Sequence, residues 1–251
     1  QQLKELMGPE FQKKKTYSIT PVFMGGAFHP KILMGVGKNN GFLAIGSGNL
    51  TGSGLSSNDE IWGAFHTYNT ESNAIGLFKS IYKYLNNLYE LTFDTNRIKF
   101  DWISKNTKWL NETLNDNEAL ESTPYLNEGN ISLVTTFGDN SLYKDITNNL
   151  PEESPESITI ASPYFNANGQ ILSNFIEDLK PRKIHVILDH RFGTVPHKFK
   201  SNNNVQFYTW EKIINEGNEE SSRLHAKLIQ IEYHNDTFLI LGSPNATVEA
   251  L

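Results

Sequence analysis

The sequence predicts an α/β protein with two halves, on the strength of two observations. Short apolar strands alternate with amphipathic helices through the second half of the chain, which is the pattern of an α/β architecture. One polar motif also occurs twice with the same internal spacing, over residues 28–51 and again over 224–247. Two like-spaced copies are much harder to obtain by chance than one, so we expect each half to carry one copy.

In the first half, alternating apolar and polar residues predict strands over 16–23 and 28–36. The turn signal Gly-Lys-Asn-Asn-Gly at 37–41 then leads into a buried return strand over 42–45, so we expect a hairpin. Residues 73–91 carry apolar side chains at helical spacing, which predicts a long amphipathic helix.

A polar stretch over 103–130, with one expected short helix around Trp109 and Leu110, connects the halves. We place the boundary near residue 125, giving halves of residues 1–125 and 126–251. The second half then alternates between the two kinds of element. Strands are predicted at 131–135, 157–161, 183–189 and 205–210, helices at 141–150 and 170–179, and a last hairpin from 224–231 and 237–241.

Far fewer residues precede the motif in the first half than in the second, so the first copy lacks a strand–helix–strand unit. We therefore expect the chain to be part of a longer polypeptide, truncated at the start of its first half and at the end of its second.

Composition limits the classes of function. With 22 Lys and Arg against 28 Asp and Glu, the net charge of −6 does not favour binding nucleic acid by bulk charge, so any such site must be local. No apolar run approaches the roughly 20 residues that span a bilayer, and we expect no membrane contact. The absence of cysteine excludes disulfides and thiolate metal sites and is compatible with a reducing compartment. Sequon-like triplets at 49–51 and 245–247 lie inside the motif, where glycosylation would block it, so we expect a cytoplasmic protein.

Each copy of the motif holds His, Lys, Ser and Asn at the same offsets. Residues two apart on a strand share a face, so the His and Lys of a copy point the same way. If the hairpins fold symmetrically about Asn39 and Asn235, each His faces its Asn and each Lys its Ser, which gives one patch per copy. The two sets are His29, Lys31, Ser47 and Asn49, and His225, Lys227, Ser243 and Asn245.

Such a patch suits a phosphate, because Lys supplies charge, Ser and Asn supply neutral donors, and His can act as nucleophile or acid. Two facing patches offer two histidines for opposite tasks. One would attack phosphorus to form a phosphohistidine, and the other would protonate the leaving oxygen and later deprotonate water. Neither patch contains a carboxylate for Mg²⁺, so we expect no metal and no other cofactor. We expect Gly46 and Gly48 to let the backbone approach a ligand.

The duplicated His-x-Lys with a downstream Gly-Ser-x-Asn resembles the phospholipase D superfamily, over both halves of the chain. The resemblance implies two pseudo-symmetric α/β/α units, with mixed β-sheets flanked by helices, whose motifs meet at the interface. It implies catalytic roles for the His, Lys and Asn of each copy and phosphate-binding roles for Ser47 and Ser243. Phospholipases of the superfamily usually carry Asp five positions after the motif Lys, where this chain has Val36 and Glu232, so lipid is disfavoured.

Glu60, eleven positions after Asn49, is similar to the Glu that orients the histidine in metal-independent nucleases and restriction endonucleases of the superfamily. We expect His29 to attack, because its copy retains this Glu. The resulting hypothesis is a metal-independent nuclease that acts on DNA rather than RNA, with both motifs in one monomer. A lipid phosphodiesterase or transferase, or a catalytically inactive nucleic-acid-binding module, is the alternative.

Some residues outside the motif are also candidates for contact with substrate. Tyr164 and Phe165 follow a predicted strand, where base stacking is possible, although core packing is the more common role. His190 and Arg191 lie at the end of another predicted strand.

Overall fold

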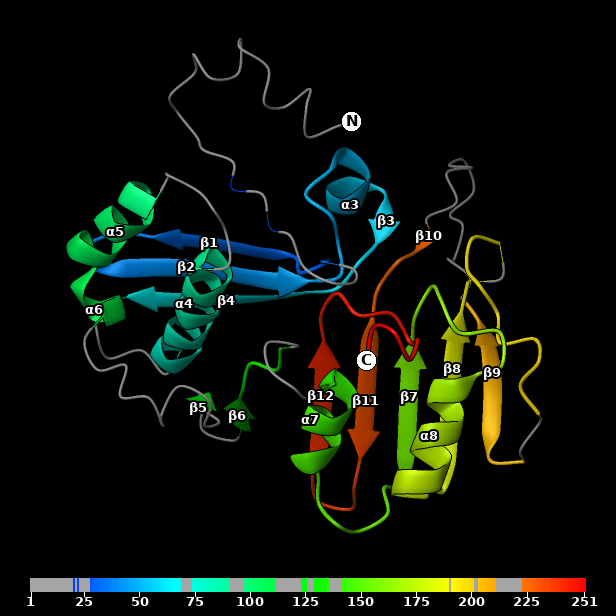
Figure 1. The fold of residues 1–251 in the computed structure, drawn as a ribbon. Coiled ribbons are helices and arrows are strands. Elements are labelled where there is room, and N and C mark those ends of the chain that lie inside the picture. The colour runs from blue at the N-terminus through cyan, green and yellow to red at the C-terminus, as the bar shows by residue number, and fades with distance from the viewer. Residues whose placement is uncertain are drawn as a thin grey trace, which may run out of the picture.

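The computed structural model describes residues 20, 22, 28–68, 74–90, 97–111, 123–125, 129–135, 141–189, 191–200, 203–210 and 223–251. The expected strand over 16–23, apart from Thr20 and Val22, and His190 lie outside these residues. Figure 1 shows two groups of strands with helices beside each, so the expected α/β class is confirmed.

The first sheet has three strands in the order β1-β2-β4, all antiparallel. Its core forms where the predicted amphipathic helix lays Phe78 and Ile81 against Leu43 of the central strand, with Trp109 beside them. Gly41 is required here, because a Cβ would lie 2.7 Å from the Phe78 ring. The elements are β1 (Ile32–Val36), β2 (Asn40–Gly46), α3 (Gly52–Ser56), β3 (Asn58–Asp59), β4 (Trp62–Tyr68), α4 (Ile75–Glu90), α5 (Arg97–Asn106) and α6 (Lys108–Asn111).

The second sheet has five strands in the order β12-β11-β7-β8-β9. Strands β7, β8 and β9 are parallel to one another, β11 is antiparallel to β7, and β12 is antiparallel to β11. The elements are β5 (Thr123–Tyr125), β6 (Gly129–Ile131), α7 (Leu142–Asn148), β7 (Ser157–Ala161), α8 (Gln170–Leu179), β8 (Lys183–Leu188), β9 (Val205–Thr209), β10 (Arg223–Leu224), β11 (Leu228–Glu232) and β12 (Thr237–Leu241).

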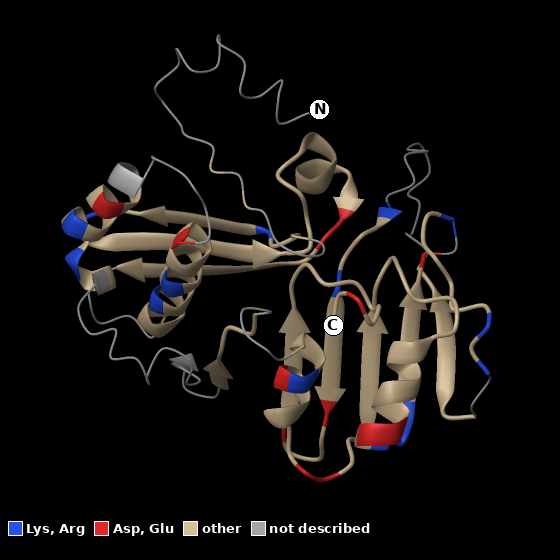
Figure 2. Ribbon diagram, in the orientation of Figure 1, with Lys and Arg blue, Asp and Glu red and all other residues tan. Residues whose placement is uncertain are grey.

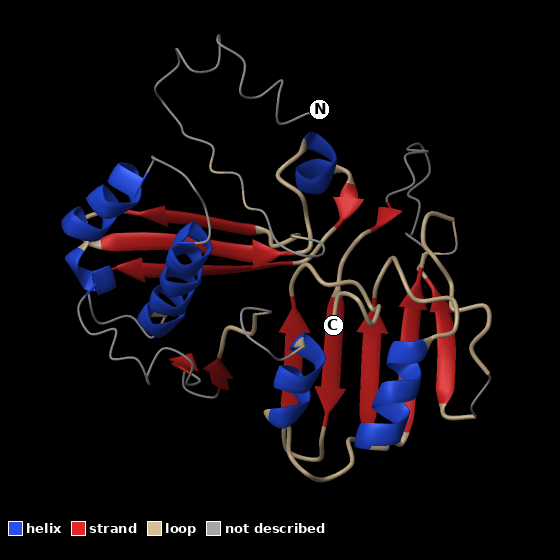
Figure 3. Cartoon of the chain, in the orientation of Figure 1, coloured by secondary structure: helices blue, strands red, loops and turns tan. Residues whose placement is uncertain are grey.

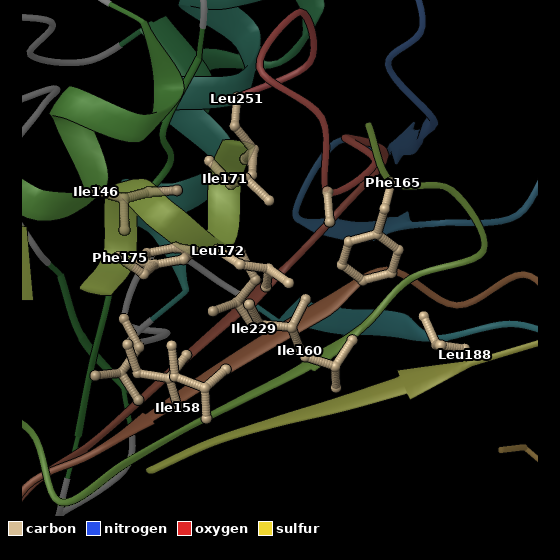
Figure 4. Packing of buried hydrophobic residues seen from close by; sticks show 14 of the residues in the cluster. Ile146, Ile158, Ile160, Phe165, Ile171, Leu172, Phe175, Leu188, Ile229 and Leu251 are labelled. Atoms are coloured by element: carbon tan, nitrogen blue, oxygen red, sulfur yellow. The ribbon is translucent and has the colours of Figure 1, made fainter. Parts of the chain in front are cut away.

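The helices α7 and α8 bury their apolar faces on one side of this sheet (Figures 3 and 4). Alternate residues of the strands, such as Ile158 and Ile160, meet Leu172 and Phe175 in a single core. The intervening residues are largely polar, so the strands have one strongly apolar face to cover. The described helices therefore cover one face, whereas an α/β/α unit has helices on both.

The hairpin of the first motif pairs one residue away from the register expected from symmetry about Asn39. Val36 lies opposite Gly41, and inside this pair the Gly37 amide donates to the Asn40 carbonyl at 2.8 Å, which leaves a turn of two residues, Lys38 and Asn39. The backbone of Gly46 accordingly bonds to that of Lys31, with the Gly46 amide donating to the Lys31 carbonyl at 3.2 Å. The expected pairing of Lys31 with Ser47, and with it that of His29 with Asn49, is wrong, because a two-residue turn is centred between residues and not on one.

The second hairpin shows the same shift. Glu232 lies opposite Thr237, and the Tyr233 amide donates to the Asp236 carbonyl at 2.8 Å, which again leaves a two-residue turn. The symmetric pairing about Asn235 is therefore also wrong. The strand expected over 224–231 is interrupted at the motif itself, where β10 ends and β11 begins. The interruption frees the side chains of residues 225–227 from the regular alternation of a sheet.

The polypeptide passes from the first core to the second later than the expected boundary at residue 125. The short strands β5 and β6 pair across that position. Ile131 and Leu133 still pack on the first core, and Val134 is the first residue of this segment to pack on the second. The strand expected over 131–135 is represented only by its first residue, which ends β6.

Candidate active site

The two copies of the motif meet where the ends of the two sheets face each other (Figure 1). In the second sheet this edge holds the carboxyl ends of β7, β8, β9 and β12 and the start of β11. In the first sheet it holds the start of β1 and the end of β2. Open α/β sheets bind ligands outside the carboxyl ends of their strands, so the location suits a functional site.

A short two-stranded sheet joins the halves at this point. Strand β3 of the first half pairs in parallel with β10 of the second. The Asp59 carbonyl accepts hydrogen bonds from the amides of His225, at 2.9 Å, and Ala226, at 2.8 Å. Its carboxylate accepts a further bond from the Trp210 indole at 2.9 Å. The backbone of the second motif is therefore fixed by the first half of the chain.

Glu60 is the carboxylate at the centre of the site. Its side chain is only 4% exposed, and its Oε1 lies 2.7 Å from His225 Nδ1. Ser47 donates to Oε2 at 2.6 Å, and the Asn58 amide donates to Oε1 at 3.3 Å. The expectation that Glu60 orients the histidine of its own copy is corrected: it contacts His225, because β3, which Glu60 follows, pairs in parallel with β10, which His225 follows.

Ser47 holds the carboxylate in place. Its side chain is fully buried, its hydroxyl donates to Glu60, and its Oγ accepts from the Ile61 amide at 3.0 Å. The Ser47 hydroxyl therefore lies against Glu60 and has no exposed surface for the phosphate that the sequence led us to expect there. A Cβ on Gly46 would lie 2.4 Å from the Ile61 carbonyl. The small residues of the motif thus allow close packing of the chain on itself, not the expected approach to a ligand.

Each motif lysine lies beside the histidine of its own copy. Lys31 Nζ is 2.8 and 3.0 Å from the two ring nitrogens of His29 and donates to the His29 carbonyl at 3.1 Å. Lys227 Nζ is 3.2 and 3.3 Å from those of His225 and donates to the His225 carbonyl at 2.7 Å. Both lysines are buried. The same arrangement is therefore built twice, which fixes each ammonium against its imidazole.

The two copies act on each other electrostatically. Burial lowers the pKa of His29, and the charges of Lys31 and Lys227 lower it further, while a hydrogen bond to the Ser243 backbone raises it. The pKa of His225 is also lowered by burial and by Lys227, with Glu60 acting in the opposite direction. Both imidazoles are thus favoured in the neutral form near pH 7.

Burial also acts on the lysines. It lowers the pKa of Lys227 to about 8, with Glu60 opposing the shift and Lys31 and Arg223 reinforcing it. Burial lowers the pKa of Lys31 as well, with Glu60 again opposing. Several cationic groups therefore share a small volume with one carboxylate, which leaves an excess of positive charge for an anion to neutralise.

The two asparagines occupy equivalent turns with different environments. The amide of Thr51 donates to the Asn49 carbonyl at 2.8 Å, and that of Thr247 donates to the Asn245 carbonyl at 2.8 Å. The Asn49 side chain is exposed. Asn245 Oδ1 is buried and accepts no hydrogen bond from the residues that the structure describes. A buried polar atom without a partner calls for an explanation, and a role toward a ligand supplies one.

Sequence reasoning missed the residues that hold the site together and border it: Asp59, Asp189, Arg223, Phe192 and Trp210. Spacing within the motif carries no signal for most of them. Arg223 could have been found, because it precedes His225 by two positions. Of the aromatic candidates, Phe165 is buried in the core, whereas Tyr164 contacts Arg223 at the edge of the site.

Comparisons with family models, with curated proteins and with solved structures find no match to this chain. Within the described ranges, His, Asp and Glu side chains do not gather in groups of three or more that could hold a metal ion. The helices described here include none with the length and apolar character needed to cross a membrane.

Proposed function

We propose that this protein is a phosphodiesterase of the phospholipase D type, a nuclease that cleaves nucleic acid, DNA in preference to RNA, through a covalent phosphohistidine. The observation that carries the proposal is the convergence of two like-built His–Lys pairs, one from each half: Glu60 contacts His225, and His29 bonds to the backbone of Ser243 in the second motif. Convergence of this kind supports a two-step phosphoryl transfer, because that chemistry needs a nucleophile, a separate acid and fixed cations. The proposed architecture is accordingly two related units with their motifs at the interface.

The contact with Glu60 favours His225 as the nucleophile. A carboxylate beside Nδ1 favours the tautomer that carries its proton there, which makes Nε2 the nitrogen with the lone pair that attacks phosphorus. It also stabilises the positive charge that the ring acquires on attack. For His29, burial and then Lys31 and Lys227 lower the pKa, and Glu60 is not among the groups that raise it, so its protonated form gives up a proton readily. We therefore assign His29 as the acid, in place of the attacking role expected from sequence.

The proposed reaction has two steps. In the first, Nε2 of His225 forms a bond to phosphorus, the bond from phosphorus to the leaving oxygen breaks, and the proton of His29 passes to that oxygen. In the second, His29 takes a proton from water, the resulting oxygen bonds to phosphorus, and the phosphorus–nitrogen bond breaks. Lys31 and Lys227 neutralise the non-bridging oxygens throughout. The products are a phosphate monoester and an alcohol.

Cleavage without a divalent metal is the first expected result. Because the proposed cations are lysines, the protein should cleave a labelled DNA or RNA strand equally well in buffer and in excess EDTA. Rapid acid-free quenching should trap phosphate on a histidine, detectable by mass spectrometry. Cleavage that stops in EDTA would contradict the proposed chemistry, binding without any turnover would favour the inactive binding module, and release of headgroup from lipid vesicles would favour the lipid enzyme.

Anion affinity should fall as pH rises through about 8. Lys227 has a pKa of about 8, so it is charged below that pH and neutral above it. Calorimetric titration with sulfate between pH 7 and pH 9.5 measures this change. Sulfate keeps a constant charge over this range, and both motif histidines are favoured in the neutral form. A change in affinity therefore comes from deprotonation of the lysines. We expect the affinity to weaken by up to about tenfold per pH unit above 8, since each ligand then costs the uptake of one proton.

The Lys227→Arg variant is the matched control, because a guanidinium stays charged at these pH values. Its sulfate affinity should lose most of the pH dependence. A wild-type affinity that is constant from pH 7 to pH 9.5 would exclude Lys227 from the anion site.

A further inference from the structure

We propose that Tyr164, Phe192, Arg191 and Arg223 form a subsite for an unpaired nucleotide beside the scissile phosphate, which makes single-stranded nucleic acid the substrate class. The inference rests on the proposed function and deepens it. We call these four residues the aromatic–arginine cluster.

The cluster interleaves two cations with two rings. The guanidinium carbon of Arg223 lies 5.6 Å from the centre of the Tyr164 ring and 5.9 Å from that of Phe192. Arg191 lies 5.4 Å from the Phe192 ring centre. Arg223 also donates to the Tyr164 hydroxyl and, at 3.4 Å, to the Phe192 carbonyl. Phe192 is nonetheless 45% exposed, so a flat ligand can reach it.

The cluster borders the candidate active site. Arg223 precedes His225 by two residues, and its charge lowers the pKa of both His225 and Lys227. Tyr164 follows β7 and Phe192 follows β8, at the edge of the sheet where the second motif lies. In Figure 2, β10, which carries Arg223, is drawn in blue above the ends of these strands.

Hydrogen bonds connect the cluster to the motif asparagine. The amide of Ala246, the residue after Asn245, donates to Ser162 Oγ at 3.1 Å. The Ser162 hydroxyl in turn lies 3.1 Å from the Tyr164 carbonyl, to which it donates. These bonds tie the backbone of Tyr164 to the turn that carries Asn245, so the cluster and the second motif are held next to each other.

A buried carboxylate holds the cluster in shape before any ligand binds. Asp189, 1% exposed, accepts through Oδ1 from the amides of Arg191, at 3.0 Å, and Phe192, at 3.2 Å. Its Oδ2 accepts from the Leu224 amide at 3.0 Å, so one side chain ties the loop of Phe192 to the strand of Arg223. Gly193 lets this loop pack tightly, since a Cβ there would lie 2.3 Å from the Pro163 carbonyl. A site fixed in this way loses little entropy on binding.

The chemistry of the cluster selects among possible ligands. Aromatic rings and guanidinium planes stack on bases, and guanidinium groups also pair with phosphate. In a duplex the base faces are covered by their neighbours in the stack, so only an unpaired base can use this surface. A choline headgroup is a cation, and two arginines beside the rings oppose its binding. The combination favours a single strand over both duplex and lipid.

Cleavage of two single strands of equal length, one with bases and one built from abasic nucleotides, tests the subsite. Phe192→Ala should lower kcat/KM for the strand with bases by roughly 5- to 150-fold, which is the usual range for losing one stacked base. It should leave the abasic strand unchanged. Phe192→Trp should retain activity, and Phe207→Ala, which removes an exposed phenylalanine from β9, serves as the matched control.

The results that would overturn the subsite differ from those that would overturn the proposed nuclease function. Equal losses on both strands, no loss on either, or cleavage of a duplex as fast as a single strand would overturn the subsite and leave the nuclease intact. If wild-type protein cleaves no strand, the nuclease fails, and fluorescence anisotropy with a labelled single strand then decides the subsite alone. Weaker binding by Phe192→Ala supports it, whereas unchanged binding, or no binding by wild type, overturns it.

Discussion

His225→Ala should abolish the covalent intermediate, with a loss of at least about 10⁴-fold in kcat, which is the order of effect seen when a catalytic nucleophile is removed. The reason is the contact of Nδ1 with Glu60 at 2.7 Å, which leaves Nε2 of this ring as the attacking atom.

His29→Ala should behave differently on an aryl phosphodiester, because nitrophenolate leaves without being protonated. That variant should release one equivalent of nitrophenolate in a burst and then stall as phospho-His225, since the base for hydrolysis is missing. Stopped-flow absorbance measures the burst of nitrophenolate, and peptide mass spectrometry detects the phosphate on His225.

His185→Ala is the matched control for both variants. His185 is a histidine on β8 that bonds to Tyr208 and lies outside the motif, so its loss should leave turnover and the burst unchanged. Phosphate found on residue 29 in the wild-type protein, or a burst that survives in His225→Ala, would reverse the assignment of the two histidines.

Glu60→Gln should lower kcat by about 10²- to 10⁴-fold with only a small change in KM, by analogy with the loss of the orienting carboxylate in a Ser-His-Asp triad. The amide keeps the size of the side chain but removes the negative charge beside His225. Because Glu60 raises the pKa of His225, its loss lowers that pKa further. The acidic limb of the kcat/KM profile, which reports the nucleophile of the free enzyme, should therefore move to lower pH. A merely structural defect would lower the rate without moving this limb.

Glu232→Gln provides the comparison for that substitution. Glu232 is also a hydrogen-bonded carboxylate, with Ser157 and Gln230 as its partners on the second sheet, but it lies at the end of β11 away from the motif. We expect the dependence of kcat/KM on pH to be the same for Glu232→Gln as for the wild type. If Glu60→Gln also overlays the wild type, Glu60 does not position the nucleophile.

Much of the local structure could be predicted because it depends on short-range patterns. The helix at 170–179 and the strands at 157–161 and 237–241 match their predicted bounds, since the periods of apolar residues are unambiguous there. The sequence predicts the hairpins, but the register predicted for both is wrong by one residue. Turn length sets the register, and the symmetry of the motif about a central Asn pointed to a three-residue geometry that the chain does not adopt.

The candidate site also has a part that the sequence predicts and a part that only the tertiary structure shows. The repeated His, Lys, Ser and Asn are visible in the primary sequence, because equal spacing is a one-dimensional property, and they were enough to specify a hypothesis of phosphoryl transfer. The roles of Glu60 and Ser47 depended on the tertiary structure. Glu60 reaches a histidine 165 positions away, and Ser47 turns inward to hold it, through contacts that spacing within one motif cannot encode. The aromatic–arginine cluster likewise exists only because folding brings the loops after β7 and β8 beside β10.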